Sequence, residues 1–465
     1  MIKQLILSTI IPLIGSSLPL GYGIGVLNSP QAVIRDWIEK GMYNNYDITL
    51  SPHQNVLVWS SVITIFLIGS TFGGLKGGVL ADRIGRRKAF MFNHLLCLCS
   101  CGLFVLCKVY QTTELLLSSQ LLLGTSAGLS SSLVPLYLSE IEPRSFKGMA
   151  VVHAFGLTLG TFISQICGMS TILGSAENWP YLACIPASCS LLALLLHPYL
   201  QESPVFIKNM KLEKEPLLST GTVGSDQHKL EKYNVYQLFK ERTLHKPILL
   251  TILLYVITVF SGLYAIVSFG NVIFTSAGLN QQQSEIASIC ATGLQCVMGI
   301  ISIFLTRKCR RRPLLLISIG GCIVSLVMLM VFLGTESSVA SYMAILSCVL
   351  YFIFYALGIG ALPCAIATEL LPEQARPLVL SLATALYWIS NILVGTSFPL
   401  VQSSIGELSI IFFIFSCICS GLIFYFYLPE TFVNETVNEN NNVTWATYSV
   451  NAHRYQRVQS SYIEI

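Results

Sequence analysis

A short charged motif, TELLPEQARP at residues 368–377, stands between two long apolar runs in a chain of which only 11% of the residues are charged. A related motif, SEIEPRSFKG, occupies residues 139–148. Both motifs place a glutamate, a proline and a basic residue at the same spacing: Glu140, Pro143 and Lys147 in the first, and Glu369, Pro372 and Arg376 in the second. Their offset of 229 residues is about half of the chain, which indicates an internal repeat.

The apolar runs around these motifs indicate a membrane protein. Hydrophobic residues make up 53% of the 465 residues, and the mean hydropathy is +0.68, more than a water-facing surface tolerates. Runs of about 20 apolar residues cross a bilayer as helices, because a helix satisfies its own backbone hydrogen bonds. Twelve such runs are predicted, at residues 5–27, 56–80, 89–109, 115–138, 149–173, 181–200, 247–274, 285–305, 314–334, 342–368, 378–401 and 408–428. The first run could also be a cleaved signal peptide, but its length and its two prolines argue against this.

Two more repeated features divide the chain into halves. The basic stretch DRIGRR at 82–87 has a counterpart, RKCRRR, at 307–312, and LQES at 200–203 has one in LPET at 428–431. Their offsets of 225 and 228 residues agree with that of the charged motifs, so we expect six spans to be repeated. The expected units are an N-terminal half (1–200), a cytosolic central loop (201–246), a C-terminal half (247–428) and a cytosolic tail (429–465). In transporters such repeats enclose a site near the bilayer midplane and rock against each other.

The basic residues predict the orientation of the chain. If both termini are cytosolic, the cytosolic segments hold 23 of the 27 lysines and arginines, which is a strong positive-inside signal. The net charge of +4 therefore reflects topology, and we expect no nucleic-acid partner. No disulfide framework is expected, because the 15 cysteines lie almost all within spans. His94, Cys97, Cys99 and Cys101 could suggest a metal site, but two-residue steps scatter thiols around a helix, so packing cysteines are expected instead.

The charged residues at the cytosolic ends of the spans are candidates for a gate. Glu140 and Glu369 can pair with arginines of the neighbouring loops, and such pairs would hold the helix ends together until the cavity opens inward. Partly exposed pairs contribute only about 0–1 kcal/mol each, so they could open thermally. The alternative is that these charges only anchor helix ends at the headgroups. The expected gate residues are Asp82, Arg83, Arg86, Arg87, Glu140, Lys147, Arg311, Arg312, Glu369 and Arg376.

These motifs resemble those of the sugar porter family of the major facilitator superfamily, and within it the animal facilitative glucose transporters (solute carrier family 2). The resemblance covers residues 20–431. It is carried by GYGIGVLNSPQ (21–31), GGVLADRIGRRK (77–88), VPLYLSEIEPRSFKG (134–148), QESPVFI (201–207) and LPET (428–431). It implies a major facilitator fold of twelve transmembrane helices that carries a hexose or a related small polar solute across a lipid bilayer by alternating access.

The same comparison shows departures at the sugar site. The stretch TVFSGLYA places Thr258 and Val259 where the family has two glutamines, and Tyr264 where it has an asparagine. A pocket with a millimolar constant has only about −4.1 kcal/mol of binding energy, and each lost hydrogen-bond partner costs about 1–3 kcal/mol. Transport of a hexose would therefore need a rearranged set of contacts. The residues expected to form it are Gln165, Thr258, Ser261, Tyr264, Asn271, Gln295, Trp388 and Asn391.

The resemblance also bears on the mode of transport. Proton-coupled relatives carry an aspartate in the first span, where this chain has Gly23, and Gln120 falls at the family's arginine of the fourth span. With no carboxylate deep in a span, we expect a uniporter driven by the substrate gradient, with no cofactor and no metal. A transport-inactive relative that senses sugar is the alternative. No phosphate loop, nucleophile elbow or metal quartet is found, so an enzyme is not expected.

Two short stretches are candidate sorting signals. EKEPLL (213–218) fits an acidic dileucine signal and YQRV (455–458) fits a tyrosine-based one, so sorting adaptors are possible partners. We expect a multi-pass protein of the plasma membrane, with an endosomal or lysosomal membrane as the alternative.

Overall fold

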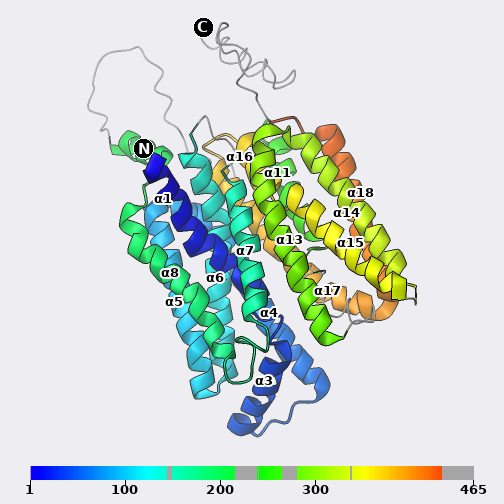
Figure 1. The fold of residues 1–465 in the computed structure, drawn as a ribbon. Coiled ribbons are helices and arrows are strands. Elements are labelled where there is room, and N and C mark those ends of the chain that lie inside the picture. The colour runs from blue at the N-terminus through cyan, green and yellow to red at the C-terminus, as the bar shows by residue number, and fades with distance from the viewer. Residues whose placement is uncertain are drawn as a thin grey trace, which may run out of the picture.

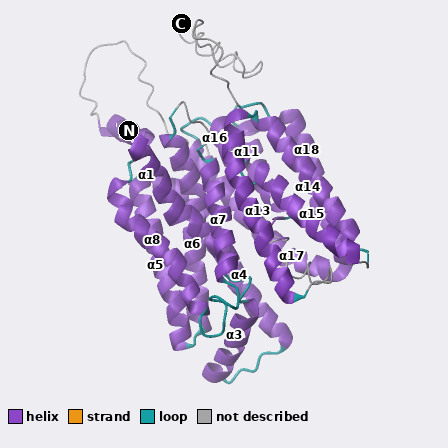
Figure 2. Ribbon diagram, viewed as in Figure 1, coloured by secondary structure: helices purple, strands orange, loops and turns teal. Residues whose placement is uncertain are grey.

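The structure, a computed structural model, describes residues 2–143, 149–214, 238, 240–263, 266, 280–335 and 338–431. Within these ranges the chain is helical, with no β-strand (Figure 2). The elements of the first 214 residues are α1 (Ile2–Pro12), the π-helix η1 (Leu13–Ser17), α2 (Leu18–Gly25), α3 (Gln31–Tyr46), α4 (Pro52–Ile84), α5 (Arg86–Tyr110), α6 (Thr113–Ile141), α7 (Val151–Cys167), η3 (Trp179–Ala183), α8 (Cys184–Leu196), η4 (His197–Tyr199) and α9 (Pro204–Lys214).

The second half repeats this arrangement of long apolar helices. Its elements are α11 (His245–Phe260), α13 (Gln281–Lys308), α14 (Arg311–Leu333), α15 (Ser338–Leu357), α16 (Leu362–Leu370), α17 (Arg376–Ile405), η5 (Gly406–Ile410) and α18 (Ile411–Tyr427). Figure 1 shows the earlier helices on one side of the molecule and the later ones on the other. The end of the bundle at which α1 begins and α6 ends is called the inner end below.

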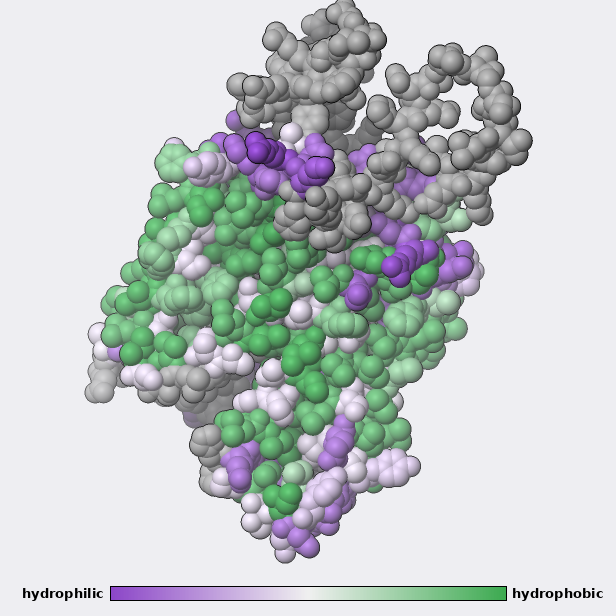
Figure 3. Space-filling model, turned by 180° about the vertical axis from the view of Figure 1, so that it is seen from behind, coloured by the Kyte–Doolittle hydropathy of each residue, from purple (hydrophilic) through white to green (hydrophobic). Residues whose placement is uncertain are grey.

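Ten of the described helices are long and apolar enough to cross a membrane. They match ten of the predicted runs, and two shorter apolar helices, Val151–Cys167 and His245–Phe260, lie where the fifth and seventh runs are predicted. On the face that Figure 3 shows, the middle of the molecule is largely hydrophobic, whereas hydrophilic residues gather toward its ends. The all-α membrane fold is thereby confirmed, and the count of twelve spans stays a prediction.

Glycines allow α4 and α6 to pack at close range. A Cβ atom at Gly73 would lie 2.1 Å from the carbonyl oxygen of Thr125, and one at Gly128 would lie 2.0 Å from that of Ser70. Only hydrogen fits at both positions, so the two backbones touch as in other small-residue helix contacts in membranes. Gly69, Gly73 and Gly77 of α4 follow one another at the four-residue spacing that is typical of such contacts.

The two halves are packed together at the inner end. Tyr137 of α6 belongs to one buried apolar cluster with Tyr255 of α11 and Leu380 of α17. The backbone N–H of Gly78 in α4 donates to Ser381 Oγ of α17 at 2.8 Å. A Cβ at Gly78 would lie 2.2 Å from the carbonyl oxygen of Pro377, so these helices also meet backbone to backbone.

Candidate functional site

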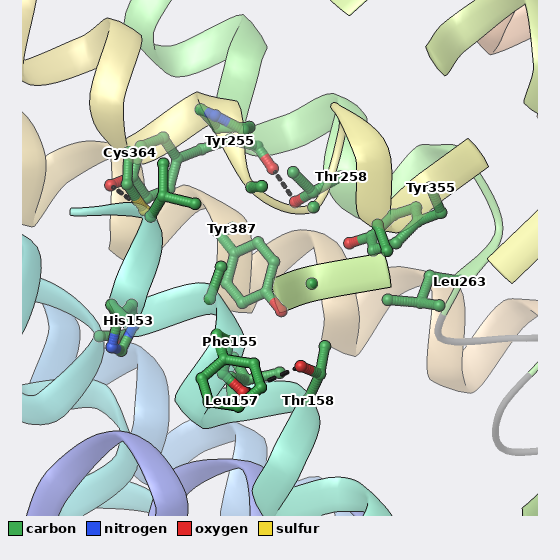
Figure 4. A pocket seen from close by; sticks show the side chains of 18 of the residues that line it. His153, Phe155, Leu157, Thr158, Tyr255, Thr258, Leu263, Tyr355, Cys364 and Tyr387 are labelled. Carbon is green, nitrogen blue, oxygen red and sulfur yellow. Dashed lines mark hydrogen bonds between the residues drawn. The ribbon is translucent and has the colours of Figure 1, made fainter. Parts of the chain in front are cut away.

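A cavity lies between the two halves, with walls from both (Figure 4). It encloses about 110 Å³, and because one water needs roughly 10–15 Å³ on this measure, it has room for several. The lining residues are Leu20, Ser131, Val151, His153, Ala154, Phe155, Leu157 and Thr158 from the first half, and Tyr255, Thr258, Leu263, Gln295, Gly299, Tyr355, Ala356, Gly360, Ala361, Pro363, Cys364, Thr384, Tyr387 and Trp388 from the second.

A break in the tenth predicted span shapes one wall of the cavity. α15 ends at Leu357 and α16 begins at Leu362, with Pro363 in its first turn. Ser318 Oγ accepts the N–H of Ile359 at 2.9 Å, so a side chain of α14 satisfies a backbone group that the break frees. Gly358, Gly360 and Pro363 favour a break of this kind. Cys364, which follows the break, lines the cavity.

Aromatic hydroxyls provide much of the polar surface of the cavity. Tyr255 OH donates to Cys364 Sγ at 3.5 Å, and Tyr387 points its hydroxyl into the space between α7 and α11 (Figure 4). Trp388 packs edge-on against Tyr387, with ring centroids 5.0 Å apart. Its indole N–H donates to Ser131 Oγ at 3.1 Å and thereby ties α17 to α6. Such rings offer a bound solute both an apolar face and a polar tip.

His153 connects the cavity to a distorted part of the first span. Its Nδ1 and Ser17 Oγ are hydrogen-bonded at 2.8 Å, and Ser17 is the last residue of the π-helix η1. Two side chains of α5 hold the preceding residues: Asn93 Nδ2 donates to Ser16 Oγ at 3.2 Å, and His94 Nδ1 contacts the carbonyl oxygen of Gly15 at 3.0 Å. π-Helical turns often occur at functional sites, and this one has three consecutive residues bound by neighbouring helices.

The inner end of the first half carries a buried ion cluster. Arg86, at the start of α5, donates to Glu140 of α6 through Nε at 2.8 Å and Nη2 at 2.6 Å, and its Nη1 pairs with Asp82 at 2.9 Å. Glu202 accepts the backbone N–H groups of Arg86 at 2.8 Å and Arg87 at 3.2 Å. Glu202 therefore caps the N-terminus of α5, where a negative charge is stabilised by the helix dipole.

The second half repeats this cluster. Arg311 Nη2 donates to Glu369 Oε1 at 2.9 Å, and Glu430 Oε1 accepts the N–H of Arg311 at 2.9 Å. Thr431 Oγ1 donates to the second oxygen of Glu369 at 2.5 Å. Arg311, Glu369 and Glu430 thus follow Arg86, Glu140 and Glu202 at offsets of 225, 229 and 228 residues. The sequence repeat corresponds to a repeated three-dimensional site.

Comparisons with known proteins agree with this geometry. Residues 8–443 match the model of the family described as "Sugar (and other) transporter". The chain belongs to the sugar transporter family.

Relatives of this family member include facilitated glucose transporters. "Facilitated glucose transporter protein 1" of Caenorhabditis elegans is 31% identical over 442 residues, covering 90% of this chain and 86% of that protein. "Solute carrier family 2, facilitated glucose transporter member 5" of Homo sapiens is 28% identical over 447 residues, covering 92% and 89%.

Solved structures show the same fold. The proton:xylose symporter XylE of the major facilitator superfamily, bound to 6-bromo-6-deoxy-D-glucose, has a TM-score of 0.75 at 18% identity, covering 92% of this chain and 97% of that one. The inward-open form of XylE from E. coli has a TM-score of 0.67 at 19% identity, covering 91% and 96%. The family member therefore has the major facilitator fold.

The structure distributes the predicted sugar-site residues over three environments. Thr258, Gln295 and Trp388 line the cavity. Gln165 Oε1 accepts from Thr292 at 2.9 Å, Ser261 Oγ donates to the carbonyl oxygen of Thr258 at 2.9 Å, and Asn391 Nδ2 donates to that of Tyr387 at 2.9 Å, so these three make contacts within and between helices and do not line the cavity. Tyr264 and Asn271 lie outside the described residues.

The lining residues His153, Tyr255, Tyr355 and Tyr387 are not among the residues predicted from the sequence, because that prediction rests on positions that match the family's sugar contacts. Helical periodicity could have indicated the wall that α7 contributes. Thr158 and Val151 precede Gln165 by seven and fourteen residues, which is about two and four helical turns, and they therefore share its side of α7. No comparable pattern marks the tyrosines.

The other predicted gate residues make different contacts. Arg87 Nη2 donates to the carbonyl oxygen of Pro198 at 3.5 Å, Arg312 Nη2 to that of Tyr425, and Arg376 Nε to that of Leu371 at 3.0 Å. Arg83 is exposed, and Lys147 lies outside the described residues. The ion pairs of Arg86 with Asp82 and Glu140, and that of Arg311 with Glu369, each lie within one half. Whether they open and close as a gate stays a prediction.

Proposed function

We propose that this member of the sugar transporter family is a uniporter, which carries a hexose or a related small polar solute by alternating access of the central cavity. The observation that carries the proposal is a cavity built from both repeated halves and lined by aromatic, hydroxyl and amide groups. None of the described residues that line it is an aspartate or glutamate. A proton-coupled carrier needs a titrating group that also senses the substrate, and the one ionisable imidazole of the lining, His153, is hydrogen-bonded to Ser17.

The proposed substrate contacts combine the predicted set with the residues that the structure adds. Thr258, Gln295 and Trp388 line the cavity, and Tyr255 and Tyr387 add hydroxyls beside them. Gln165, Ser261 and Asn391 would contact the substrate only after their helices move during the transport cycle. Tyr264 and Asn271 remain candidates for substrate contacts. The relatives named for glucose transport support a sugar as the substrate.

The alternative is a family member that binds sugar and senses it without transport. It shares the cavity and differs in whether the two halves complete the transport cycle. We further propose the plasma membrane as the location, with an endosomal or lysosomal membrane as the alternative and both termini in the cytosol. The candidate sorting signals at 213–218 and 455–458 have most or all of their residues outside the described part of the chain.

The test is uptake of radiolabelled sugars by purified protein in proteoliposomes. Glucose, fructose, inositol and dehydroascorbate would each be offered with and without a pH gradient. Saturable uptake of one of them that is insensitive to the pH gradient is expected. Accumulation against the sugar gradient, driven by the pH gradient, would contradict uniport and direct attention to His153. Saturable binding without uptake would favour the sensor.

A pair of glycine substitutions tests whether the cavity is the path of the solute. Gly299 lines the cavity, with Phe155 and Thr158 at 3.5 and 3.6 Å from a Cβ built there, so the larger side chain of G299L fills the space. Gly320 of α14 has nothing within 4 Å of its Cβ position and is exposed on the flank. We expect G299L to reduce uptake at least about tenfold, because one blocked contact of about 1.4 kcal/mol has that effect, and G320L to leave uptake unchanged. Equal uptake by both variants would place the path elsewhere.

A further inference from the structure

A second hollow lies at the inner end of the first half, away from the sugar cavity. It is an open groove of about 950 Å³ between the start of α1, the turn that follows α8, and α9. Its lining residues are Lys3, Gln4, Leu7, Arg87, Pro198, Tyr199, Leu200, Gln201, Glu202, Pro204, Ile207 and Lys208. We call it the α1–α9 groove.

The charges of the α1–α9 groove are strongly one-sided. Three of its lining residues are cations, Lys3, Arg87 and Lys208. The one carboxylate, Glu202, is already engaged: its Oε1 accepts the N–H groups of Arg86 at 2.8 Å and Ser203 at 3.0 Å, and its Oε2 accepts that of Arg87 at 3.2 Å. Its charge therefore caps α5 and is not shared with the lysines. Within the described ranges, neither Lys3 nor Lys208 forms an ion pair.

The groove continues onto a surface suited to hydrocarbon. Leu7 and Ile207 also belong to its lining. Ile6 of α1 is 49% exposed and Leu195 of α8 is 68% exposed, and exposed apolar side chains of this kind suit a hydrocarbon environment. Figure 1 shows α8 running beside α1 from this end of the bundle. A cationic site at the inner end thus adjoins an apolar flank.

We propose that the α1–α9 groove binds an anionic phospholipid of the inner leaflet, with the headgroup phosphate between Lys3, Arg87 and Lys208 and the acyl chains along α1 and α8. Basic pockets at the cytosolic ends of membrane helices bind acidic headgroups in this way. A free phosphate compound offers the same charge. The lipid is preferred because the groove opens onto the flank that carries Ile6 and Leu195, which a soluble anion would leave unused.

Binding to the full-length protein tests the proposal. Protein purified in detergent is titrated with a short-chain phosphatidylinositol phosphate, with phosphatidylcholine of the same chain length, and with the inositol phosphate headgroup alone, and native mass spectrometry counts the bound molecules. The double variant K3Q/K208Q removes two cations, each worth about 1 kcal/mol to an acidic headgroup, so its affinity for the acidic lipid should fall about 30-fold. Phosphatidylcholine should bind weakly to both proteins.

The matched control is K308Q/R310Q, which removes two exposed cations at the inner end of the other half. We expect this variant to bind the acidic lipid as the unmodified protein does. Equal losses in both variants would mean that general surface charge attracts the lipid, and would overturn the proposal. A headgroup that binds as tightly without acyl chains would replace the lipid by a soluble phosphate ligand, and would overturn it as well.

Discussion

The ion clusters at the inner ends of the two halves have the same plan but differ in how their carboxylates are used. Both arginines are almost completely buried, each with 2% of its side chain exposed. Glu140 is 5% exposed and receives two nitrogens of Arg86, whereas Glu369 is 17% exposed and divides its oxygens between Arg311 and the hydroxyl of Thr431. In the first cluster, two parallel hydrogen bonds from Arg86 fix the Glu140 carboxylate. In the second cluster, one donor to Glu369 is the Thr431 hydroxyl, which can rotate.

A second difference is visible in the sequence repeat. Asp82 gives Arg86 another acidic partner, and the residue at the offset of 225 is Arg307, which carries the opposite charge. The comparison teaches that the two halves share the central arginine–glutamate contact, whereas the residues around that contact differ. We therefore expect the first cluster to hold its helices together more firmly than the second.

The largest expected effect is that of E140Q. An amide has only one acceptor oxygen, so its NH₂ group would face an N–H of Arg86, and a buried arginine would lose its bidentate partner. We expect the free energy of unfolding to fall by about 3 kcal/mol. In E369Q the amide can be accommodated, because the Thr431 hydroxyl can accept where it now donates, and about 1 kcal/mol is expected.

Both variants are compared by SDS titration in mixed micelles, followed by far-ultraviolet circular dichroism. E177Q, which changes an exposed carboxylate, is the control and should unfold as the unmodified protein does. If E369Q is destabilised as much as E140Q, the two clusters are equally rigid and the comparison fails.

A smaller loss of stability than that of E140Q is expected when the capping carboxylates Glu202 and Glu430 are changed. Both oxygens of Glu202 accept backbone N–H groups at the start of α5, so the amide of E202Q would turn a donor toward a donor. Loss of a helix cap costs about 1–2 kcal/mol. E430Q can keep its amide oxygen on the N–H of Arg311, and a loss below about 0.5 kcal/mol is expected. The same titration measures both, and the reverse order would show that the second cap is the stronger.

A further effect, of the size expected for E369Q, concerns the hydroxyl that distinguishes the second cluster. T431V removes the donor to Glu369 while it preserves the shape of the side chain, so about 1 kcal/mol of stability should be lost. T431S restores the hydroxyl and should recover most of that loss. A double-mutant cycle of E369Q and T431V then gives the coupling directly. A coupling near zero would show that the hydroxyl does not support Glu369.

Much of the fold could be predicted because its physical signals lie along the chain. Long apolar runs marked the spans, and charged residues marked their ends. The repeat also aligned Glu202 with Glu430 before any contact was known. What the repeat could not give was the partner of each charge: Arg86 and Arg87 are adjacent, yet only Arg86 turns to Glu140 while Arg87 turns to the carbonyl of Pro198.

The lining of the central cavity was predictable only in part, because it depends on how the helices rotate against each other. Thr258 and Gln295 could be located from the family's motifs, and they line the cavity. Tyr387 and Trp388 are adjacent in the sequence, and yet both line the cavity. The hydrogen bond from the Trp388 indole N–H to Ser131 Oγ holds the Trp388 ring in that orientation. Such orientation follows from packing in three dimensions, for which a single sequence carries no periodic signal.

The π-helical turn at Leu13–Ser17 also fixes the phase of the first span. A π turn takes up one residue more than an α-helical turn, so the helix on either side keeps the phase that it would have without the extra residue. Tyr22 thereby stays directed at the carbonyl oxygen of Leu182, which its hydroxyl reaches at 2.9 Å, and Gly21 stays against the backbone of Leu157. Deletion of one residue within Leu13–Ser17 can be absorbed by closure of the π turn, whereas deletion of one residue from Leu18–Gly25 would rotate the residues that follow by about 100° and should be tolerated far less well.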